Sequence, residues 1–249
     1  MNNTIENLLA LLQSPDAAQR SSAALQLQPR LGDDDAAIGA LARVICADDD
    51  LNVIEDATWS LVRYGADAIP ALLDALNGAN PQARHNIAHA LGKIGDARAL
   101  PALIAAAGDE NTAVRVKSVY ALGQIGDSQA IDALVERLAD SAQDVAWTAR
   151  EALGTFAGKG LPQLIQSLAA DSAQARELAA NLLGEMGDSR AVEPLIAALN
   201  TDDWEVRFAI VEALGAIGDA RARPSLQAMT EDAQPQVRAI ASASLELLG

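Results

Sequence analysis

Residues 109–127 read Asp109-Glu-Asn-Thr-Ala-Val-Arg-Val-Lys-Ser-Val-Tyr-Ala-Leu-Gly-Gln-Ile-Gly-Asp127, and variants of this stretch return along the chain. Self-similarity at a fixed period is typical of repeat proteins, in which each repeat buries its apolar face against its neighbours. The sequence therefore predicts one continuous array of repeats, a single domain over residues 1–249. The leucine of the stretch recurs every 30 or 31 residues, at Leu91, Leu122, Leu153, Leu183, Leu214 and Leu245.

Each repeat is predicted to contain two helices, A and then B, so that the fold class is all-α with about eight helix pairs. The A helices are expected near residues 4–13, 36–47, 66–77, 97–107, 128–139, 159–169, 189–199 and 220–230. The B helices are expected near residues 16–30, 51–64, 81–94, 111–125, 142–156, 173–186, 203–217 and 234–248. Pro29 should end the first B helix early. A glycine, which adopts the left-handed conformation at low cost, should end the B helices at Gly32, Gly65, Gly95, Gly126, Gly158, Gly187, Gly218 and Gly249.

Two further columns of residues predict how the repeats pack. A glycine inside a helix costs about 1 kcal/mol relative to alanine. We therefore expect a close approach of the neighbouring helix at Gly92, Gly123, Gly154, Gly184 and Gly215. An arginine near the start of helix B should bond to carboxylates or helix ends of neighbouring repeats, at Arg20, Arg84, Arg115, Arg176, Arg207 and Arg238. Ile54 and Ala146 replace this arginine in two repeats, which indicates either a loosened interface or ordinary drift of the repeat.

Charge and cysteine content exclude several classes of function. The chain carries 34 acidic and 18 basic residues, a net charge of −16, and such a field repels nucleic acids and anionic membranes. Cys46 is the only cysteine, so no intramolecular disulfide or multi-cysteine metal site is expected, and we expect a buried, inert thiol. The N-terminal stretch lacks the basic start of a signal peptide, and no apolar run approaches membrane-spanning length. These features predict a cytoplasmic protein.

The pattern D-x-x-x-V-R-x-x-A-x-x-A-L-G-x-I-G-D resembles HEAT repeats, in particular the short HEAT-like repeats named after phycobilisome lyases (PBS lyase repeats). The resemblance covers essentially the whole chain. It implies an α-α superhelix, an α-solenoid whose B helices line the concave surface. The same repeats occur in bilin lyases, hydroxylases and adaptor proteins, so the resemblance is specific for the fold and not for the function.

The positions that differ between repeats are the candidates for function. The residues one and five places after the arginine position lie one turn apart on one face of each B helix. Aromatic residues among charges are typical of binding hot spots; the alternative is that some of these rings fill gaps between repeats. The predicted partner-binding stripe consists of Glu55, Trp59, His85, His89, Tyr120, Trp147, Arg150, Glu151 and Phe208, with Lys117, Glu177, Asn181 and Glu212 as secondary residues.

His85 and His89 form an HxxxH pair, which has the spacing to hold one metal ion from a helix face. The zinc-protease motif places glutamate directly after the first histidine, but Asn86 stands there, and the chain has no third histidine. The several His-Glu steps of iron-dependent HEAT hydroxylases are absent as well. We therefore expect no metal and no other cofactor, and contacts of the imidazoles with a partner or ligand instead.

The leading hypothesis is a non-catalytic scaffold, adaptor or assembly chaperone that binds a protein partner in the concave groove. The alternative, suggested by the resemblance, is a bilin lyase or lyase subunit that attaches a linear tetrapyrrole to a phycobiliprotein. In that case His85 and His89 would hold the bilin, and Arg150 or Lys117 would meet its propionates. No catalytic motif is visible, and no catalytic residue is predicted.

Overall fold

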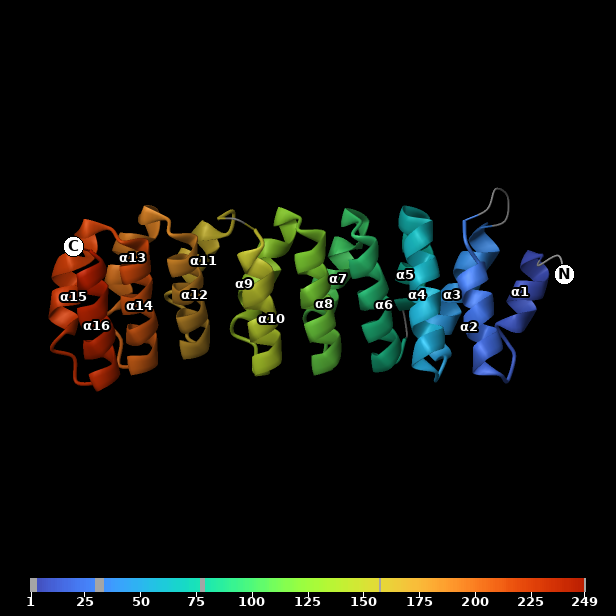
Figure 1. Cartoon of the computed structure of the whole chain (residues 1–249), viewed down its shortest axis with the longest axis horizontal. Coiled ribbons are helices and arrows are strands. Elements are labelled where there is room, and N and C mark those ends of the chain that lie inside the picture. The colour runs from blue at the N-terminus through green and yellow to red at the C-terminus, as the bar shows by residue number, and fades with distance from the viewer. Residues whose placement is uncertain (1–3, 30–33, 77–78, 157, 249) are drawn as a thin grey trace. The chain divides into compact units, whose positions relative to one another are not determined.

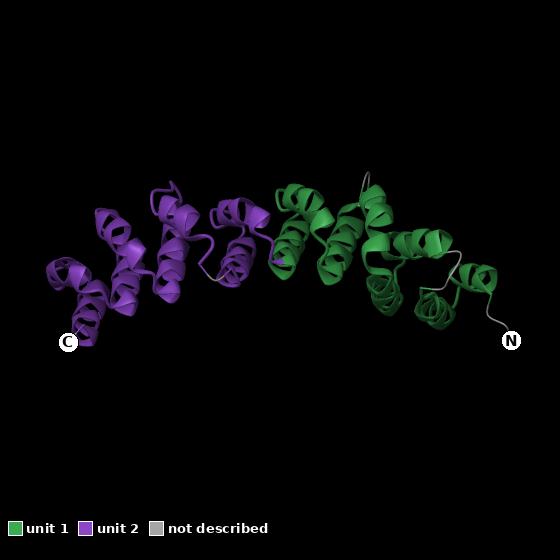
Figure 2. Ribbon diagram, turned by 90° about the horizontal axis from the view of Figure 1, so that it is seen from above, with its two compact units in different colours: residues 1–125 green, residues 126–249 purple. Residues whose placement is uncertain are grey.

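The computed structural model describes residues 4–29, 34–76, 79–156 and 158–248. All regular elements of the described residues are helices, which confirms the all-α fold class, a HEAT-like α-solenoid of successive helix pairs (Figure 1). The chain divides into two compact units, residues 1–125 and 126–249 (Figure 2). The single continuous domain therefore stays a prediction, and each unit is described by itself below.

The first unit alternates A and B helices. Each B helix contacts the A helix of its own repeat, and α2, α4, α6 and α8 pack in succession. In the described residues its helices are α1 (Ile5–Leu11), α2 (Ala17–Gln26), α3 (Asp34–Ala47), α4 (Leu51–Tyr64), α5 (Ile69–Leu76), α6 (Pro81–Ile94), α7 (Leu100–Ala106) and α8 (Thr112–Ile125).

The second unit repeats this arrangement, with α10, α12, α14 and α16 as its successive B helices. Its described helices are α9 (Ile131–Arg137), α10 (Gln143–Gly154), α11 (Leu161–Ser167), α12 (Ala173–Met186), α13 (Val192–Ala198), α14 (Trp204–Ile217), α15 (Arg223–Met229) and α16 (Pro235–Leu247). Every predicted helix is found in the two units, with its ends shifted by a few residues.

The largest shift concerns the A helices, most of which begin with a short 3-10 helix instead of an α-helical turn. An aspartate caps this turn in all of these 3-10 helices except the first: Asp96 Oδ1 accepts a hydrogen bond of 2.9 Å from the Arg98 N–H, and Asp219 does the same for Arg221. The aspartate that follows the glycine therefore has a structural role, as an N-cap. The 3-10 helices are η1 (Gly65–Ala68), η2 (Ala97–Ala99), η3 (Ser128–Ala130), η4 (Ser189–Ala191) and η5 (Ala220–Ala222).

The ends of the B helices follow the sequence prediction except in α10, which ends at Gly154, four residues before the predicted Gly158. The first B helix, α2, ends at Gln26, as expected from Pro29. Gly32 and Gly249 lie outside the described residues. The other predicted end glycines have a positive φ, which a residue with a Cβ rarely adopts, and these are Gly65, Gly95, Gly126, Gly158, Gly187 and Gly218.

The glycines inside the B helices mark close helix contacts in three places. A methyl group on Gly184 would lie 2.8 Å from the Cα of Ala213 on α14, and Gly92 and Gly215 are similarly close to the next B helix. The prediction is wrong at Gly154, where nothing lies within 4 Å of such a group. A bulky residue explains the difference, because Leu182 stands where the other repeats place alanine or serine.

The arginine column joins consecutive repeats as predicted. Arg84 Nε lies 2.7 Å from Asp109 Oδ2 of the next repeat, and Arg84 also donates to the carbonyl oxygen of Ala79 in its own repeat. Arg207 does the same with Asp232, at 2.7 Å, and with the Thr201 carbonyl, at 2.8 Å. Each of these arginines thus ties the loop that precedes its helix to the loop of the following repeat.

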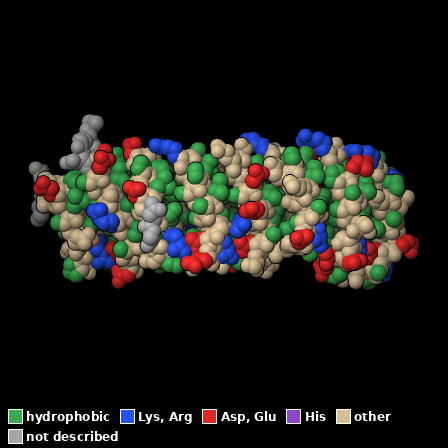
Figure 3. Space-filling model, turned by 180° about the vertical axis from the view of Figure 1, so that it is seen from behind, with side chains coloured by type: hydrophobic (Ala, Val, Ile, Leu, Met, Phe, Trp, Pro, Cys, Tyr) green, Lys and Arg blue, Asp and Glu red, His purple; other side chains and the backbone are tan. Residues whose placement is uncertain are grey.

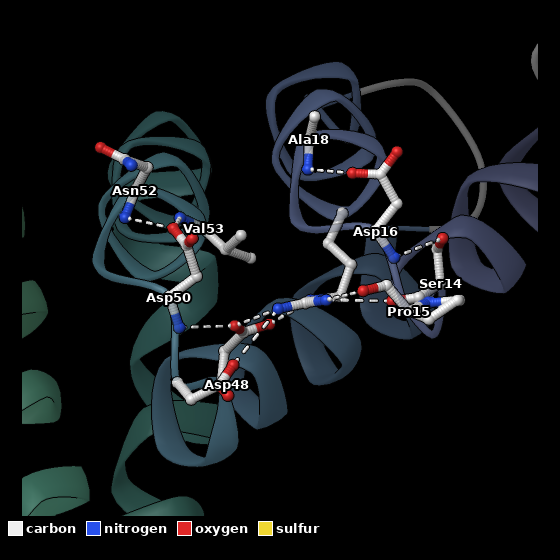
Figure 4. Close-up of polar contacts among 10 residues, drawn as sticks. Ser14, Pro15, Asp16, Ala18, Asp48, Asp50, Asn52 and Val53 are labelled. Atoms are coloured by element: carbon white, nitrogen blue, oxygen red, sulfur yellow. Dashed lines mark hydrogen bonds and ion pairs between the residues drawn. The ribbon is translucent and has the colours of Figure 1, made fainter.

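The first arginine of the column shows the full arrangement. Arg20 binds both carboxylate oxygens of Asp48 and donates to the carbonyl oxygens of Ser14 and Pro15. Figure 4 shows that Ser14 and Pro15, from one loop, and Asp48, from another, meet at the same guanidinium group. The guanidinium beside it lowers the pKa of the Asp48 carboxyl.

The leucine column lies in the core, with the exception of Leu245, which is half-buried in the final helix. Cys46 is half-buried instead of fully buried, and the partial burial raises the pKa of its thiol. A thiol with a raised pKa is a poor nucleophile. The expectation of an unreactive thiol therefore stands, although the side chain is only half-buried.

Candidate partner-binding surfaces on the B helices

Seven side chains of the first unit gather on the adjacent helices α4, α6 and α8. We call this group the α4–α8 patch. It contains six residues of the predicted stripe and one that the sequence analysis did not single out, Lys93. Its members are Glu55 and Trp59 on α4, His85, His89 and Lys93 on α6, and Lys117 and Tyr120 on α8.

The contact between α4 and α6 is built around Lys93. Its Nζ lies 4.2 Å from the centroid of the Trp59 ring and 3.7 Å from Glu55 Oε1. Glu55 also approaches the imidazole of His89, with 3.6 Å between Oε2 and Nε2. A cation over an aromatic face and beside a carboxylate holds all three partners in place.

The contact between α6 and α8 involves the second histidine. His85 Nδ1 lies 3.2 Å from the carbonyl oxygen of Ala113, which assigns the hydrogen to this nitrogen. Lys117 Nζ lies 5.6 Å from the centroid of the Tyr120 ring. Two lysine–aromatic pairs therefore flank the two histidines.

The positive charges of the patch repel one another. Burial is the largest cause of the lowered pKa of His89, and Lys117 and Lys93 lower it further, while Glu55 offsets only part of this. The pKa of His85 is lowered by burial and then by Lys117. The pKa of Lys117 itself is lowered by burial and then by Lys93. The cationic forms of these side chains are thus disfavoured, first by burial and then by repulsion from the neighbouring lysines.

Three aromatic side chains of the stripe are about half exposed. The exposed fraction is 46% for Trp59, 49% for Tyr120 and 45% for Trp147. A partner could therefore reach these three rings, which favours a binding surface over gap filling at their positions. Phe208 on α14 is half-buried and fits the gap-filling alternative better.

The second unit presents a different surface on α10, α12 and α14. Arg150 forms an ion pair with Glu185 on α12, and its guanidinium lies 5.6 Å from the centroid of the Trp147 ring. An open pocket of about 340 Å³ beside this pair is lined in part by Arg150, Asn181, Glu185 and Glu212.

Two other predicted residues of this unit are acidic. Glu151 is exposed on α10, and Glu177 is half-buried on α12. Burial raises the pKa of Glu177, and Glu205 raises it further. The surface of the second unit is therefore rich in carboxylates, in contrast to the α4–α8 patch.

Sequence reasoning missed Lys93 and Glu185, which complete the two surfaces. Both occupy the variable position between the glycine and the following apolar residue at the end of a B helix. Lys93 lies one turn beyond His89, and Glu185 lies one turn beyond Asn181. Continuing the stripe by one more turn would have found both.

The packing of α10 on α12 is looser than at the other B–B contacts of the second unit. An open cavity of about 510 Å³ there is lined by residues that include Leu153, Gly154, Leu182 and Met186. Ala146 stands in place of the arginine that joins other repeats, so it supplies no guanidinium to the next repeat. Leu182 stands in place of alanine or serine and keeps α10 and α12 apart at Gly154. These two differences from the other repeats explain the cavity between α10 and α12.

Among the described residues, no group of three or more His, Cys, Asp or Glu side chains is placed to hold a metal ion. Within the same residues, no helix has the length and apolar character needed to cross a bilayer. The view from behind (Figure 3) shows acidic and basic side chains scattered among hydrophobic ones, with no histidine in view.

Comparison with protein families identifies the class of this protein. A family model described as HEAT repeats matches residues 69–154 and 161–246. Because these stretches make up more than half of the sequence, the chain belongs to the HEAT repeat family. No curated protein matches the chain at a significant level.

Solved structures resemble the chain over nearly its whole length. Human deoxyhypusine hydroxylase is 25% identical, with 98% of this chain and 95% of that chain covered and a TM-score of 0.43. The CpcE–CpcF complex of phycocyanin lyase from a Nostoc species is 23% identical, with 100% and 96% covered and a TM-score of 0.45. Both scores are too low to support an argument about function.

A third structure is closer in shape but more distant in sequence. Kap95p, solved with RanGDP, is 13% identical and has a TM-score of 0.62, and the match covers 98% of this chain and 40% of that chain. At this identity the likeness shows the fold alone.

Proposed function

We propose that this protein is a non-catalytic scaffold, an adaptor or assembly chaperone, that binds a protein partner through its B helices. The observation that carries the proposal is the α4–α8 patch. Its half-exposed Trp59 and Tyr120 rings lie beside charged side chains on three packed helices. Accessible aromatic residues on a rigid support, framed by charges, are typical of protein-binding hot spots.

The exposed Trp147 on α10 extends the proposal to the second unit. Arg150 and Glu185 hold each other beside this ring, and Asn181 and Glu212 line the neighbouring pocket. We treat it as a secondary contact surface. A cytoplasmic location is part of the proposal, because a chain with one half-buried free thiol suits a reducing compartment.

A capture experiment tests the proposal. The immobilised chain is incubated with native lysate of its source, and the proteins retained by the wild type are compared with those retained by the Trp59→Ala/Tyr120→Ala variant. Leu247→Ala is the matched control, since Leu247 is an exposed apolar residue on α16, outside the patch. We expect a defined partner to be lost only with the double variant, at unchanged helicity by circular dichroism.

Two outcomes contradict the proposal. Equal capture by the wild type and the double variant would exclude the patch as the binding surface. A coloured eluate, whose visible absorbance disappears in the double variant, would replace the scaffold by a bilin lyase related to the PBS lyase repeats.

A further inference from the structure

We propose that the α4–α8 patch recognises an acidic segment of the partner protein, whose carboxylates bind between His85, His89, Lys93 and Lys117. The proposal rests on the proposed function and specifies the chemistry of its partner.

The α4–α8 patch concentrates lysine and histidine side chains on an acidic chain. The net charge is −16, and the chain has only three lysines and two histidines. The α4–α8 patch contains both histidines and two of the lysines, Lys93 and Lys117; the third, Lys159, belongs to the second unit. Near neutral pH the patch carries the positive charges of Lys93 and Lys117 against one carboxylate, Glu55, on an otherwise acidic chain. The two histidines, whose pKa values are lowered, are neutral at that pH and gain charge when an anion approaches.

The lysines and histidines of the patch have little negative charge beside them. Most arginines of the chain have a carboxylate partner; Arg84 and Arg207, for example, bind Asp109 and Asp232. Among the described residues, Glu55 is the one carboxylate within ion-pair distance of the patch lysines and histidines. Because the cations also lower one another's pKa, an added carboxylate stabilises all of them.

The two aromatic rings of the patch lie directly beside its lysines. Lys93 lies over Trp59, and Lys117 lies near Tyr120, so that each ring is half-exposed next to a cation. A segment that alternates acidic and apolar side chains matches this arrangement, since carboxylates meet the lysines and apolar groups cover the rings.

The charge distribution favours a peptide over a nucleic acid. A long polyanion would extend beyond the patch along a chain whose net charge is −16, and a field of this sign repels phosphates. A short peptide segment places its few carboxylates on the patch alone.

The test uses the full chain, labelled with ¹³C at lysine and ¹⁵N at histidine, and a capped hexaglutamate peptide as the probe. Three lysine and two histidine signals are easily assigned by single substitutions. We expect the peptide to shift the signals of Lys93, Lys117, His85 and His89, to leave Lys159 unchanged, and to raise the pKa of both histidines.

Charge variants complete the test. Lys93→Gln/Lys117→Gln should weaken hexaglutamate binding by about tenfold or more, while Lys93→Arg/Lys117→Arg should retain it. Lys159→Gln is the matched control, and circular dichroism checks that every variant is folded. Equal shifts at Lys159, no shift at the patch, or tighter binding of hexalysine or of a single-stranded oligonucleotide would overturn the proposal.

Capture from lysate separates this inference from the proposed function. If the partner is lost with Trp59→Ala/Tyr120→Ala but retained with Lys93→Gln/Lys117→Gln, the scaffold stands and the acidic segment is wrong. If hexaglutamate binds the patch but the aromatic variant still captures the partner, the inference about charge stands and the proposed role of the rings is wrong.

Discussion

Gly92 of α6 packs so closely against Ala121 of α8 that a methyl group on Gly92 would lie 2.6 Å from the Cβ of Ala121. The glycine therefore lets two consecutive B helices approach backbone to backbone. Its cost to the helix, about 1 kcal/mol relative to alanine, is offset by the packing that this approach permits.

The first prediction follows from this contact. Gly92→Ala should lower the free energy of unfolding by about 1–3 kcal/mol, the usual range for an overpacked site. Gly154→Ala is the matched control, because nothing lies within 4 Å of the added methyl group. This control should be neutral or more stable by up to about 1 kcal/mol. Urea unfolding followed by circular dichroism measures both, and equal effects at the two sites would contradict the packing argument.

The second prediction concerns the missing arginine of α10. Arg84 and Arg207 each bind an aspartate that lies in the loop of the next repeat, and Asp171 occupies this place for Ala146. Ala146→Arg should therefore stabilise the chain by about 1 kcal/mol. In the Asp171→Asn background the gain should disappear. A destabilising effect of Ala146→Arg would show instead that the packing around the buried Ala146 cannot accept a larger side chain.

The third prediction concerns acid stability. The hydrogen bond from Arg221 lowers the pKa of Asp219 from 3.8 to about 2. The unfolded chain therefore takes up this proton more readily, so the stabilisation is complete above the unfolded pKa and is lost as the pH falls towards 2. Asp219→Asn should lower the free energy of unfolding near neutral pH and have little effect near pH 2. Glu231→Gln, on the same unit, is the control; a difference that persists at low pH would contradict the charge argument.

The fourth prediction concerns the two histidines. The pKa values of both His85 and His89 lie below the ordinary 6.5, chiefly through burial. Protons bind better to the unfolded chain, so the contribution to stability is present above about pH 6.5 and is lost as the pH falls below it. The wild type should lose more stability between about pH 7.5 and pH 5.5 than His85→Gln/His89→Gln. Urea unfolding at both pH values measures this, and identical losses would contradict it.

The sequence predicts most of this fold because the residues that pack the helices recur at the same positions in several repeats. The period of Leu122 places the helix pairs, and the position of Arg84 predicts its bond to the next repeat. The 3-10 turns were missed because a proline early in an A helix is compatible with either kind of helix. Asp96 indicates such a turn, since an aspartate whose side chain accepts a hydrogen bond from the backbone N–H two residues later is a typical cap.

The candidate site was predicted less completely. Trp59, His89 and Tyr120 are recognisable because they interrupt a column of otherwise ordinary residues. The predicted stripe lacks Lys93 because it ends one turn before this residue. The exception at Gly154 depends on Leu182, which lies in the next repeat, so the sequence of the glycine's own repeat does not reveal it.

The loose packing between α10 and α12 has a mechanical consequence. Neighbouring B helices of the second unit are held by close backbone packing at Gly184 and Gly215, and by arginine bridges that must break before the helices separate. Between α10 and α12 a cavity replaces the close backbone contact, and the Arg150–Glu185 ion pair that joins the two helices is partly exposed and therefore weak. Under a pulling force along the second unit, this joint should therefore part first, and the repeats on either side should stay folded.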